Sequence, residues 1–298
     1  MRRYFATLLL LAAIGPQVVT AQRAIPDDNL AYPVLINLTD CSSNIATIKA
    51  SGFFLDTGLV VYLVTARHVL FNESEHVQPN HARPLQCKKA ELLSYSKDPK
   101  DKQQNHFQLD LQNLNEAGKV KAHATHDVAA VQVGVPRTAI KPGASGIWDI
   151  LPGVQVIHHT PSGPVSVSME GVKKLSEVLT PDDIYVFGYP SSIGMQQSPQ
   201  IDYASPLIRK GIVSGINDAN KTIVLDCLTF QGNSGGPVLE VTRQAFGTEF
   251  RIIGVVSQYV PVTETWINTT LSYYNLQIHN SGYSIAEPMD MVLELVGQ

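Results

Sequence analysis

The stretch Phe230-Gln231-Gly232-Asn233-Ser234-Gly235-Gly236-Pro237 places one serine among three glycines, and the apolar pair Val238-Leu239 follows it. Glycine adopts positive φ and lets other backbone come close, so the pattern predicts a tight turn that presents the serine hydroxyl. The amide N–H groups of Gly232 and Ser234 can point at one spot on such a turn. Acyl transfer needs this combination of a nucleophile and donors for an oxyanion. We therefore predict that Ser234 is a nucleophile, which requires a histidine base and a carboxylate elsewhere in the chain.

A histidine follows a short apolar, β-branched run. Residues 59–64 predict a buried strand that leads into Thr65-Ala66-Arg67-His68-Val69-Leu70. An arbitrary histidine at the end of such a strand is usually a core residue with satisfied nitrogens. The serine motif favours the other interpretation, in which His68 is the general base.

The candidate acid heads a second run of strand composition, His126-Asp127-Val128-Ala129-Ala130-Val131. Asp127 is either a surface residue at the start of a strand or a carboxylate that accepts the Nδ1–H of His68 and fixes its tautomer. We choose the second interpretation because the serine and histidine motifs require an acid. His126 competes with His68 for the role of base, but no second motif supports it.

Many short strands with turn signals, and almost no helical pattern inside the chain, predict an all-β protein. The expected strands are 29–36, 46–55, 59–64, 90–96, 106–111, 119–123, 128–133, 154–158, 165–169, 183–188, 207–216, 222–227, 238–239 and 251–257, with a hairpin formed by 154–158 and 165–169. Residues 136–153 are rich in Pro, Gly and Ser and separate two lobes of ordinary size. Residues 284–297 predict a terminal helix, because Ser284 and Glu287 have capping-box spacing and apolar residues then recur on one face.

The first 21 residues predict a secretory signal peptide. Arg2 and Arg3 precede an apolar run at 8–14, and Ala21 closes the segment with a small residue. A membrane anchor is the alternative, but the run is too short to span a bilayer. We therefore expect export to the periplasm or the extracellular space, with cleavage near Ala21 and a mature chain of residues 22–298.

Composition and charge argue against several classes of partner. The chain has 298 residues, a net charge of −4 and no basic cluster that would suggest nucleic acid. No stretch after the signal is apolar enough to span a membrane. His158 and His159 are adjacent and would point opposite ways in a strand, and nothing is spaced as a metal site. We expect no metal or other cofactor.

Three cysteines, Cys41, Cys87 and Cys227, leave at least one thiol unpaired. Cys41 and Cys87 lie on either side of His68 in the sequence. They either form a disulfide in an oxidising compartment or remain buried thiols.

Taken together, the histidine, aspartate and serine blocks resemble the chymotrypsin-fold serine peptidases, and most closely the bacterial trypsin-like and HtrA-like branch. Their order along the chain is that of this family. The resemblance implies two six-stranded antiparallel β-barrels with a C-terminal α-helix. The expected units are an N-terminal barrel at about 28–135, a connection at about 136–180, a C-terminal barrel at about 181–283 and a helix at about 284–297.

The resemblance also implies a mechanism for a secreted serine endopeptidase. Ser234 attacks a scissile peptide carbonyl of a polypeptide substrate, His68 takes its proton, and Asp127 orients the imidazole. The amides of Gly232 and Ser234 hold the oxyanion. By the same resemblance Leu228 lies at the floor of the specificity pocket, and Thr229, Ser257 and Tyr259 contribute to the substrate site.

Substrate preference follows from these positions only in part. Leu228 favours an apolar or small P1 residue, but Asp226 shares its face of a strand and leaves a basic preference open. Residues 257–259 are the expected strand that pairs with the substrate backbone.

Two departures from relatives carry expectations of their own. Asn233 stands where the digestive branch has an aspartate that pairs with a freed N-terminus, so we expect activity that does not depend on N-terminal processing. HtrA-like relatives carry a peptide-binding domain after the barrel, and about 40 residues after Tyr259 are too few for one.

Two alternatives remain at this point. A catalytically silent relative would bind peptides or a protein partner, and an esterase would use the same triad. An α/β-hydrolase is a poorer match, because its acid and histidine follow its serine in the chain.

Overall fold

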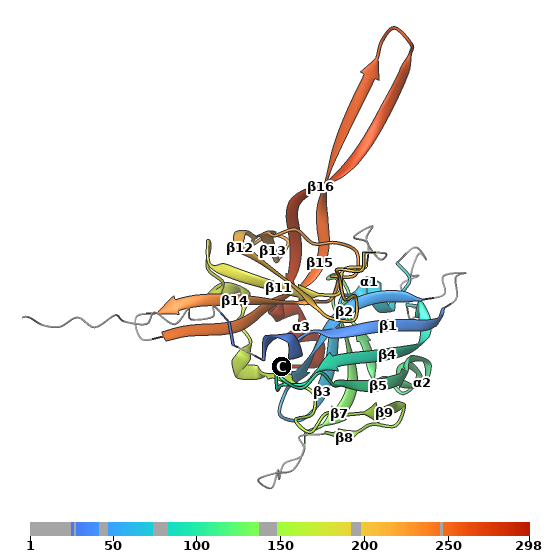
Figure 1. Cartoon of the computed structure of the whole chain (residues 1–298), viewed down its shortest axis with the longest axis vertical. Coiled ribbons are helices and arrows are strands. Elements are labelled where there is room, and N and C mark those ends of the chain that lie inside the picture. The colour runs from blue at the N-terminus through green and yellow to red at the C-terminus, as the bar shows by residue number, and fades with distance from the viewer. Residues whose placement is uncertain are drawn as a thin grey trace, which may run out of the picture.

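The computed structural model describes residues 25–26, 28–41, 47–73, 83–136, 148–191, 198–244 and 247–298. The predicted signal peptide and residues 137–147 of the predicted connection lie outside the described residues. Within these ranges the chain forms two β-sheets, and helices are few and short (Figure 1). The prediction of an all-β, two-barrel protein with a C-terminal helix is confirmed.

The N-terminal lobe is a ten-stranded sheet in the order β6-β7-β3-β2-β1-β4-β5-β9, with β10 on β2 and β8 on β7. Its strands are β1 (Val34–Cys41), β2 (Ile48–Asp56), β3 (Val61–Thr65), β4 (Cys87–Tyr95), β5 (Gln104–Asp110), β6 (Val120–Ala122), β7 (Ala129–Val135), β8 (Asp149–Ile150), β9 (Val154–His158) and β10 (Ser166–Ser168). The extra strands β8, β9 and β10 come from the segment we predicted as connection. Ile150 of β8 and Val154 and Val156 of β9 pack against the core of this sheet, while Val167 of β10 packs on the cluster between the lobes.

The predicted hairpin of 154–158 with 165–169 is wrong. Strand β9 pairs with β5, with Val156 opposite Phe107, and β10 pairs in parallel with β2, with Ser166 opposite Phe54. The turn between them is held instead by Asn105 of β5, whose side-chain oxygen accepts the backbone N–H of Thr160 at 2.9 Å.

The C-terminal lobe is a closed barrel of six strands in the order β11-β12-β13-β16-β15-β14, which matches the predicted strand number. Its strands are β11 (Asp183–Gly188), β12 (Leu207–Asn217), β13 (Thr222–Asp226), β14 (Pro237–Gln244), β15 (Gly247–Asn268) and β16 (Tyr273–Pro288). The helical segments of the described chain are η1 (Asn29–Ala31), α1 (Arg67–Leu70), α2 (Leu111–Glu116), η2 (Met169–Gly171), η3 (Leu175–Glu177) and α3 (Met289–Val296).

The terminal helix α3 begins later than predicted, at Met289 rather than 284. Ser284 pairs with Leu225 of β13 as part of strand β16, and its fully buried hydroxyl donates to the carbonyl of Cys227 at 2.6 Å. The capping-box spacing therefore does not mark a helix start here, because Ser284 makes its side-chain contact within the barrel.

Three apolar clusters form the core, and one of them joins the lobes. One cluster fills the N-terminal sheet and another fills the C-terminal barrel. Between them, Phe53 and Val64 of the first lobe pack with Phe187 and Val255 of the second, and Val292 of α3 covers the same cluster. The packing of both lobes on α3 fixes the cleft where their loops meet.

Cys41 and Cys87 form a disulfide that links β1 to β4. Cys227 is free and buried. Burial raises the pKa of the Cys227 thiol to about 11, with Arg209 acting in the opposite direction.

Strands β15 and β16 continue beyond the barrel as a long two-stranded hairpin that stands away from the body of the molecule (Figure 1). We name its residues 260–282 the arm. Paired residues run from Pro261 opposite Asn280 to Asn268 opposite Tyr273. The sequence patterns predict no strand in this part of the chain.

Candidate active site

His68 is delivered by a buried strand. All residues of β3 are buried, and the four-residue helix α1 begins directly after the extended residue Ala66. Val69 and Leu70 of the same helix are buried in the N-terminal core, which leaves the His68 ring partly exposed at the edge of the cleft.

Asp127 is presented by the loop between β6 and β7, and Arg67 holds that loop. The Nη1 group of Arg67 donates to the carbonyls of His123 at 2.9 Å and His126 at 2.8 Å. The His123 ring accepts the backbone N–H of His126 at 3.0 Å. The residue next to the candidate base thus fixes the segment that carries the candidate acid, a role that we did not assign from the sequence.

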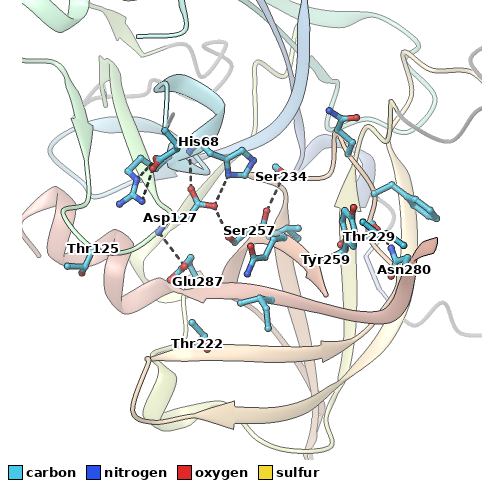
Figure 2. A pocket seen from close by; sticks show the side chains of 18 of the residues that line it. His68, Thr125, Asp127, Thr222, Thr229, Ser234, Ser257, Tyr259, Asn280 and Glu287 are labelled. Carbon is cyan, nitrogen blue, oxygen red and sulfur yellow. Dashed lines mark hydrogen bonds and ion pairs between the residues drawn. The ribbon is translucent and has the colours of Figure 1, made fainter. Parts of the chain in front are cut away.

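The carboxylate of Asp127 binds His68 at two points. Its Oδ1 accepts the backbone N–H of His68 at 2.9 Å, and its Oδ2 lies 2.7 Å from the ring Nδ1 (Figure 2). With the proton on Nδ1, the ring is held with Nε2 directed away from the acid and available as a base.

A third hydrogen bond to Asp127 comes from the other lobe. The hydroxyl of Ser257 donates to Oδ2 at 2.6 Å. Burial acts to raise the pKa of Asp127, but the hydrogen bonds and charge of His68 and the Ser257 hydroxyl outweigh it, so this pKa lies below its ordinary value of 3.8. Asp127 is therefore an ionised acceptor at neutral pH.

The neighbouring His126 has a different partner. Its Nδ1 lies 2.7 Å from Oε2 of the buried Glu287, and Oε1 of Glu287 accepts the backbone N–H of Asp127 at 3.3 Å. Glu287 therefore supports the backbone of the acid from strand β16. His126, the competitor considered for the base, is bound within this second pair.

Ser234 sits on a turn that requires glycine. Gly232 has φ +96° and Gly235 has φ +85°, and a Cβ atom on Gly235 would lie 2.1 Å from the carbonyl oxygen of Ser51. The backbone N–H of Ser51 donates to the carbonyl of Ser234 at 3.0 Å. The buried hydroxyl of Ser51 donates to the carbonyl of Gly232 at 2.7 Å and accepts the N–H of Tyr189 at 3.0 Å.

Ser51 thus clamps the turn from the opposite lobe, and sequence reasoning missed it. The signal that could have identified it is a hydroxyl in the otherwise apolar, buried stretch 50–55 of β2.

The amides of this turn separate into two groups. The N–H groups of Asn233, Gly235 and Gly236 donate to backbone carbonyls at 2.7–2.9 Å. In the part of the chain that the structure describes, the N–H groups of Gly232 and Ser234 have no such acceptor. Two donors are therefore available beside the serine hydroxyl.

The hydroxyl of Ser234 donates to the carbonyl of Ser257 at 3.3 Å (Figure 2). Within the described residues no hydrogen bond joins it to the His68 ring. Nevertheless Ser234, His68 and Asp127 line one cavity of about 880 Å³ between the lobes. The structure therefore gathers all three residues at one place, with the acid–base pair already formed.

The profile of the trypsin-like peptidase domain family matches residues 50–247, well over half of the chain and inclusive of all three residues. The chain belongs to this family. Among similar solved structures is the serine endoprotease from Yersinia pestis, with 13% identity and a TM-score of 0.43 over 92% of this chain and 66% of that chain. This chain thus spans just under two thirds of that protein's length. Curated protein sequences give no match.

Three of the four predicted substrate-site residues of this chain line the cavity, namely Thr229, Ser257 and Tyr259. Leu228 is not among the lining residues, and its assignment to the floor of the pocket remains a prediction. The cavity also includes Asn280, whose side-chain amide donates to the carbonyl of Thr229 at 2.7 Å. Asn280 belongs to the arm and was not predicted.

The described residues were also examined for metal-binding groups and for membrane-spanning helices. Within the described ranges, no three His, Cys, Asp or Glu side chains are grouped so that they could hold a metal ion. A search of the helices in those ranges finds none with the length and hydropathy needed to cross a membrane.

Proposed function

We propose that this protein is an exported serine endopeptidase that cleaves through an acyl-enzyme on Ser234. The observation that carries the proposal is the His68–Asp127 pair at 2.7 Å, which faces the same cavity as Ser234 and its two available amides. This arrangement supplies a base, a nucleophile and oxyanion donors together.

The chemistry uses a rotation of one side chain. When Ser234 turns from the Ser257 carbonyl toward His68, Nε2 takes the hydroxyl proton as Oγ attacks the scissile carbonyl carbon. The oxyanion is held by the N–H groups of Gly232 and Ser234. Collapse breaks the C–N bond as His68 returns the proton to the leaving amine, and water then releases the acyl group by the same steps.

Export has two supports. The first 21 residues have the pattern of a signal peptide. The Cys41–Cys87 disulfide is typical of proteins that leave the reducing cytosol.

We propose that activity does not depend on processing of the N-terminus to a fixed residue. Asn233 is buried, and its Oδ1 accepts the backbone N–H of Phe230 at 3.0 Å, so a partner within the turn satisfies this oxygen. Peptide hydrolysis should be equal before and after trimming to Pro26, and an increase on trimming would contradict this proposal.

We also propose an apolar or small P1 residue. The cavity wall beside Ser234 is formed by Thr229, Phe230 and Gln231, which carry no charge. Cleavage of a peptide library would test the preference, and dominant cutting after Lys or Arg would overturn it.

The main test is labelling with a fluorophosphonate probe, followed by assays on a peptide and on an ester. We expect the wild type to be labelled and to cut both substrates, while Ser234→Ala is folded and does neither. A protein that is never labelled would be a silent relative. A protein that is labelled but hydrolyses only the ester would be an esterase.

A further inference from the structure

The arm exposes apolar side chains on both faces, with Val262, Trp266 and Tyr273 on one and Ile267, Tyr274, Leu276 and Ile278 on the other. Residues opposite each other in an antiparallel pair share a face, and successive residues alternate. One face therefore carries the pairs Thr263–Ile278, Thr265–Leu276 and Ile267–Tyr274. We name these six residues the apolar face of the arm.

This apolar face is uncovered. Ile267, Tyr274, Leu276 and Ile278 are 71%, 75%, 52% and 62% exposed. A two-stranded hairpin is marginal in water unless a third strand or another surface packs on it. Contiguous exposed apolar side chains of this kind mark an interaction site.

The arm also has an open strand edge, and this edge starts at the catalytic centre. Pairing of β15 with β14 ends at Val255, and Val256 is still bonded to the serine turn through Gly235 and Gly236. From Ser257 to Asn268 the edge of β15 away from β16 has no neighbouring strand among the described residues. Its first residue, Ser257, is the one whose carbonyl accepts the Ser234 hydroxyl.

The base of the arm is fixed to the wall of the cavity. Tyr259, Ile278 and Asn280 line the cavity (Figure 2 labels Tyr259 and Asn280). Asn280 donates to the carbonyl of Thr229 at 2.7 Å, and Ser281 donates to the carbonyl of Val260 at 2.7 Å. The catalytic cavity and the arm therefore form one continuous surface.

We infer that the arm extends the substrate pairing expected at residues 257–259: an extended polypeptide continues along the open edge of β15 from Val260 toward Asn268 and packs alternate apolar side chains on the apolar face. This inference rests on the proposed peptidase function. Strand addition supplies main-chain hydrogen bonds, and the face supplies side-chain preference. Antiparallel addition, the more stable arrangement, places the residues N-terminal to the scissile bond along the arm. Pro261 has no backbone N–H, so in the ladder with the added polypeptide it can only accept a hydrogen bond through its carbonyl.

The substrate class follows from the charge of the arm. Glu264 is its one carboxylate, and the chain has no Lys or Arg after Arg251. The segment bound there is weakly charged, with apolar residues at alternate positions. A membrane is a poorer partner, because the arm lacks basic residues for anionic headgroups and its open edges would leave backbone groups unsatisfied in hydrocarbon.

The first experiment compares a short and a long substrate. The short peptide has three residues up to and including P1. The long peptide carries eight further residues N-terminal to these, with Val at alternate positions. In the test variant, Asn-Gly replaces residues 264–277, so a two-residue turn joins Thr263 to Ile278 and the cavity-lining residues remain. We expect kcat/KM for the long peptide to fall about tenfold, mainly through KM, while the short peptide is cleaved as before.

Two further variants keep the test decisive if the shortened chain fails to fold. Ile267→Ser with Leu276→Ser changes only exposed side chains of the apolar face and should reproduce the loss on the long peptide. Leu271→Ser in the turn, beyond the last strand pair, is the matched control and should leave both substrates unaffected. Equal effects on long and short peptides would overturn the inference. Failure of the wild type to cut either peptide would overturn the proposed function instead.

Hydrogen exchange locates the peptide directly. With Ser234→Ala and the long peptide, amides of residues 258–268 should gain protection while those of 273–281 do not. Protection that grows with protein concentration in the absence of peptide, together with dimers in sedimentation, would assign the arm to a second copy. Flotation of the protein with phosphatidylcholine vesicles would assign it to a membrane. Either result would overturn the inference.

Discussion

The two lobes prepare their catalytic groups in different ways. The N-terminal lobe holds His68 and Asp127 together through two hydrogen bonds of 2.9 and 2.7 Å. The C-terminal lobe holds Ser234 on a glycine turn with its hydroxyl directed to Ser257. The comparison teaches that the proposed base and acid are already paired, and that in the proposed mechanism only the Ser234 side chain must turn to join them.

Two small hydroxyl residues connect the lobes at this point. Ser51 of the first lobe bonds the backbone of Gly232 and Ser234, and Ser257 of the second bonds Asp127. Each lobe thus reaches into the catalytic half of the other, so the relative position of base and nucleophile does not depend on apolar packing alone.

The largest expected effect comes from breaking the pair in the N-terminal lobe. Asp127→Asn keeps the shape of the acid but favours the wrong tautomer of His68, and we expect kcat to fall about 10⁴-fold. Steady-state peptide hydrolysis would measure the loss, and an unchanged melting temperature would show that the fold is intact. A fall of less than tenfold would mean that Asp127 does not orient the base.

The C-terminal lobe has a buried brace that catalysis does not use. Lys173 and Glu240 form a buried ion pair, and Oε1 of Glu240 also accepts the N–H of Leu179 at 3.0 Å. Lys173→Met would leave the carboxylate buried without its cation, so we expect the free energy of unfolding to fall by about 3–5 kcal/mol. Urea denaturation would measure it, and Lys173→Met with Glu240→Leu should recover part of the loss.

The contact between the lobes gives a smaller effect on activity. Ser51→Ala would leave the carbonyl of Gly232 and the amide of Tyr189 without their partner and loosen the serine turn. We expect kcat to fall about tenfold to a hundredfold with a smaller change in KM. Ser94→Ala is the matched control, because Ser94 is a buried serine of the same sheet whose hydroxyl accepts from Asn105 of β5. Equal kinetics for both variants would refute the clamp.

The smallest effect is on stability at low pH. The pKa of Asp127 in the folded chain lies below its ordinary value of 3.8, so ionised Asp127 stabilises the fold at pH values above 3.8. This contribution is lost as the pH falls through the folded pKa. The difference in unfolding free energy between wild type and Asp127→Asn should therefore narrow from pH 6 to pH 3. A constant difference over this range would contradict the assigned shift.

The sequence predicted what short local patterns encode. The Gly-rich serine turn, the strand before His68 and the strand after Asp127 are all contiguous, and the structure has each of them. Ser51 and Glu287 escaped notice because their partners lie 181 and 160 residues away in the chain. No pattern within a short window specifies such contacts.

The arm and the start of α3 were missed for other reasons. Residues 260–282 alternate apolar side chains with Thr, Asn and Gln, but they contain no continuous apolar run of the kind that marked the other strands. The alternation of Tyr274, Leu276 and Ile278 with Asn275, Gln277 and His279 was the available signal. Ser284 and Glu287 imitated a helix cap because the barrel and the acid loop use the same residue types.

The disulfide between β1 and β4 makes the stability of the protein depend on the redox state of its surroundings. It closes a segment of 46 residues, and its loss would remove about 4 kcal/mol of loop-closure stabilisation without altering any catalytic side chain. A molecule retained among cytosolic reductants would keep its chemistry but survive for less time against unfolding and degradation. Redox surroundings would therefore set the lifetime of this protein rather than the rate of its proposed reaction.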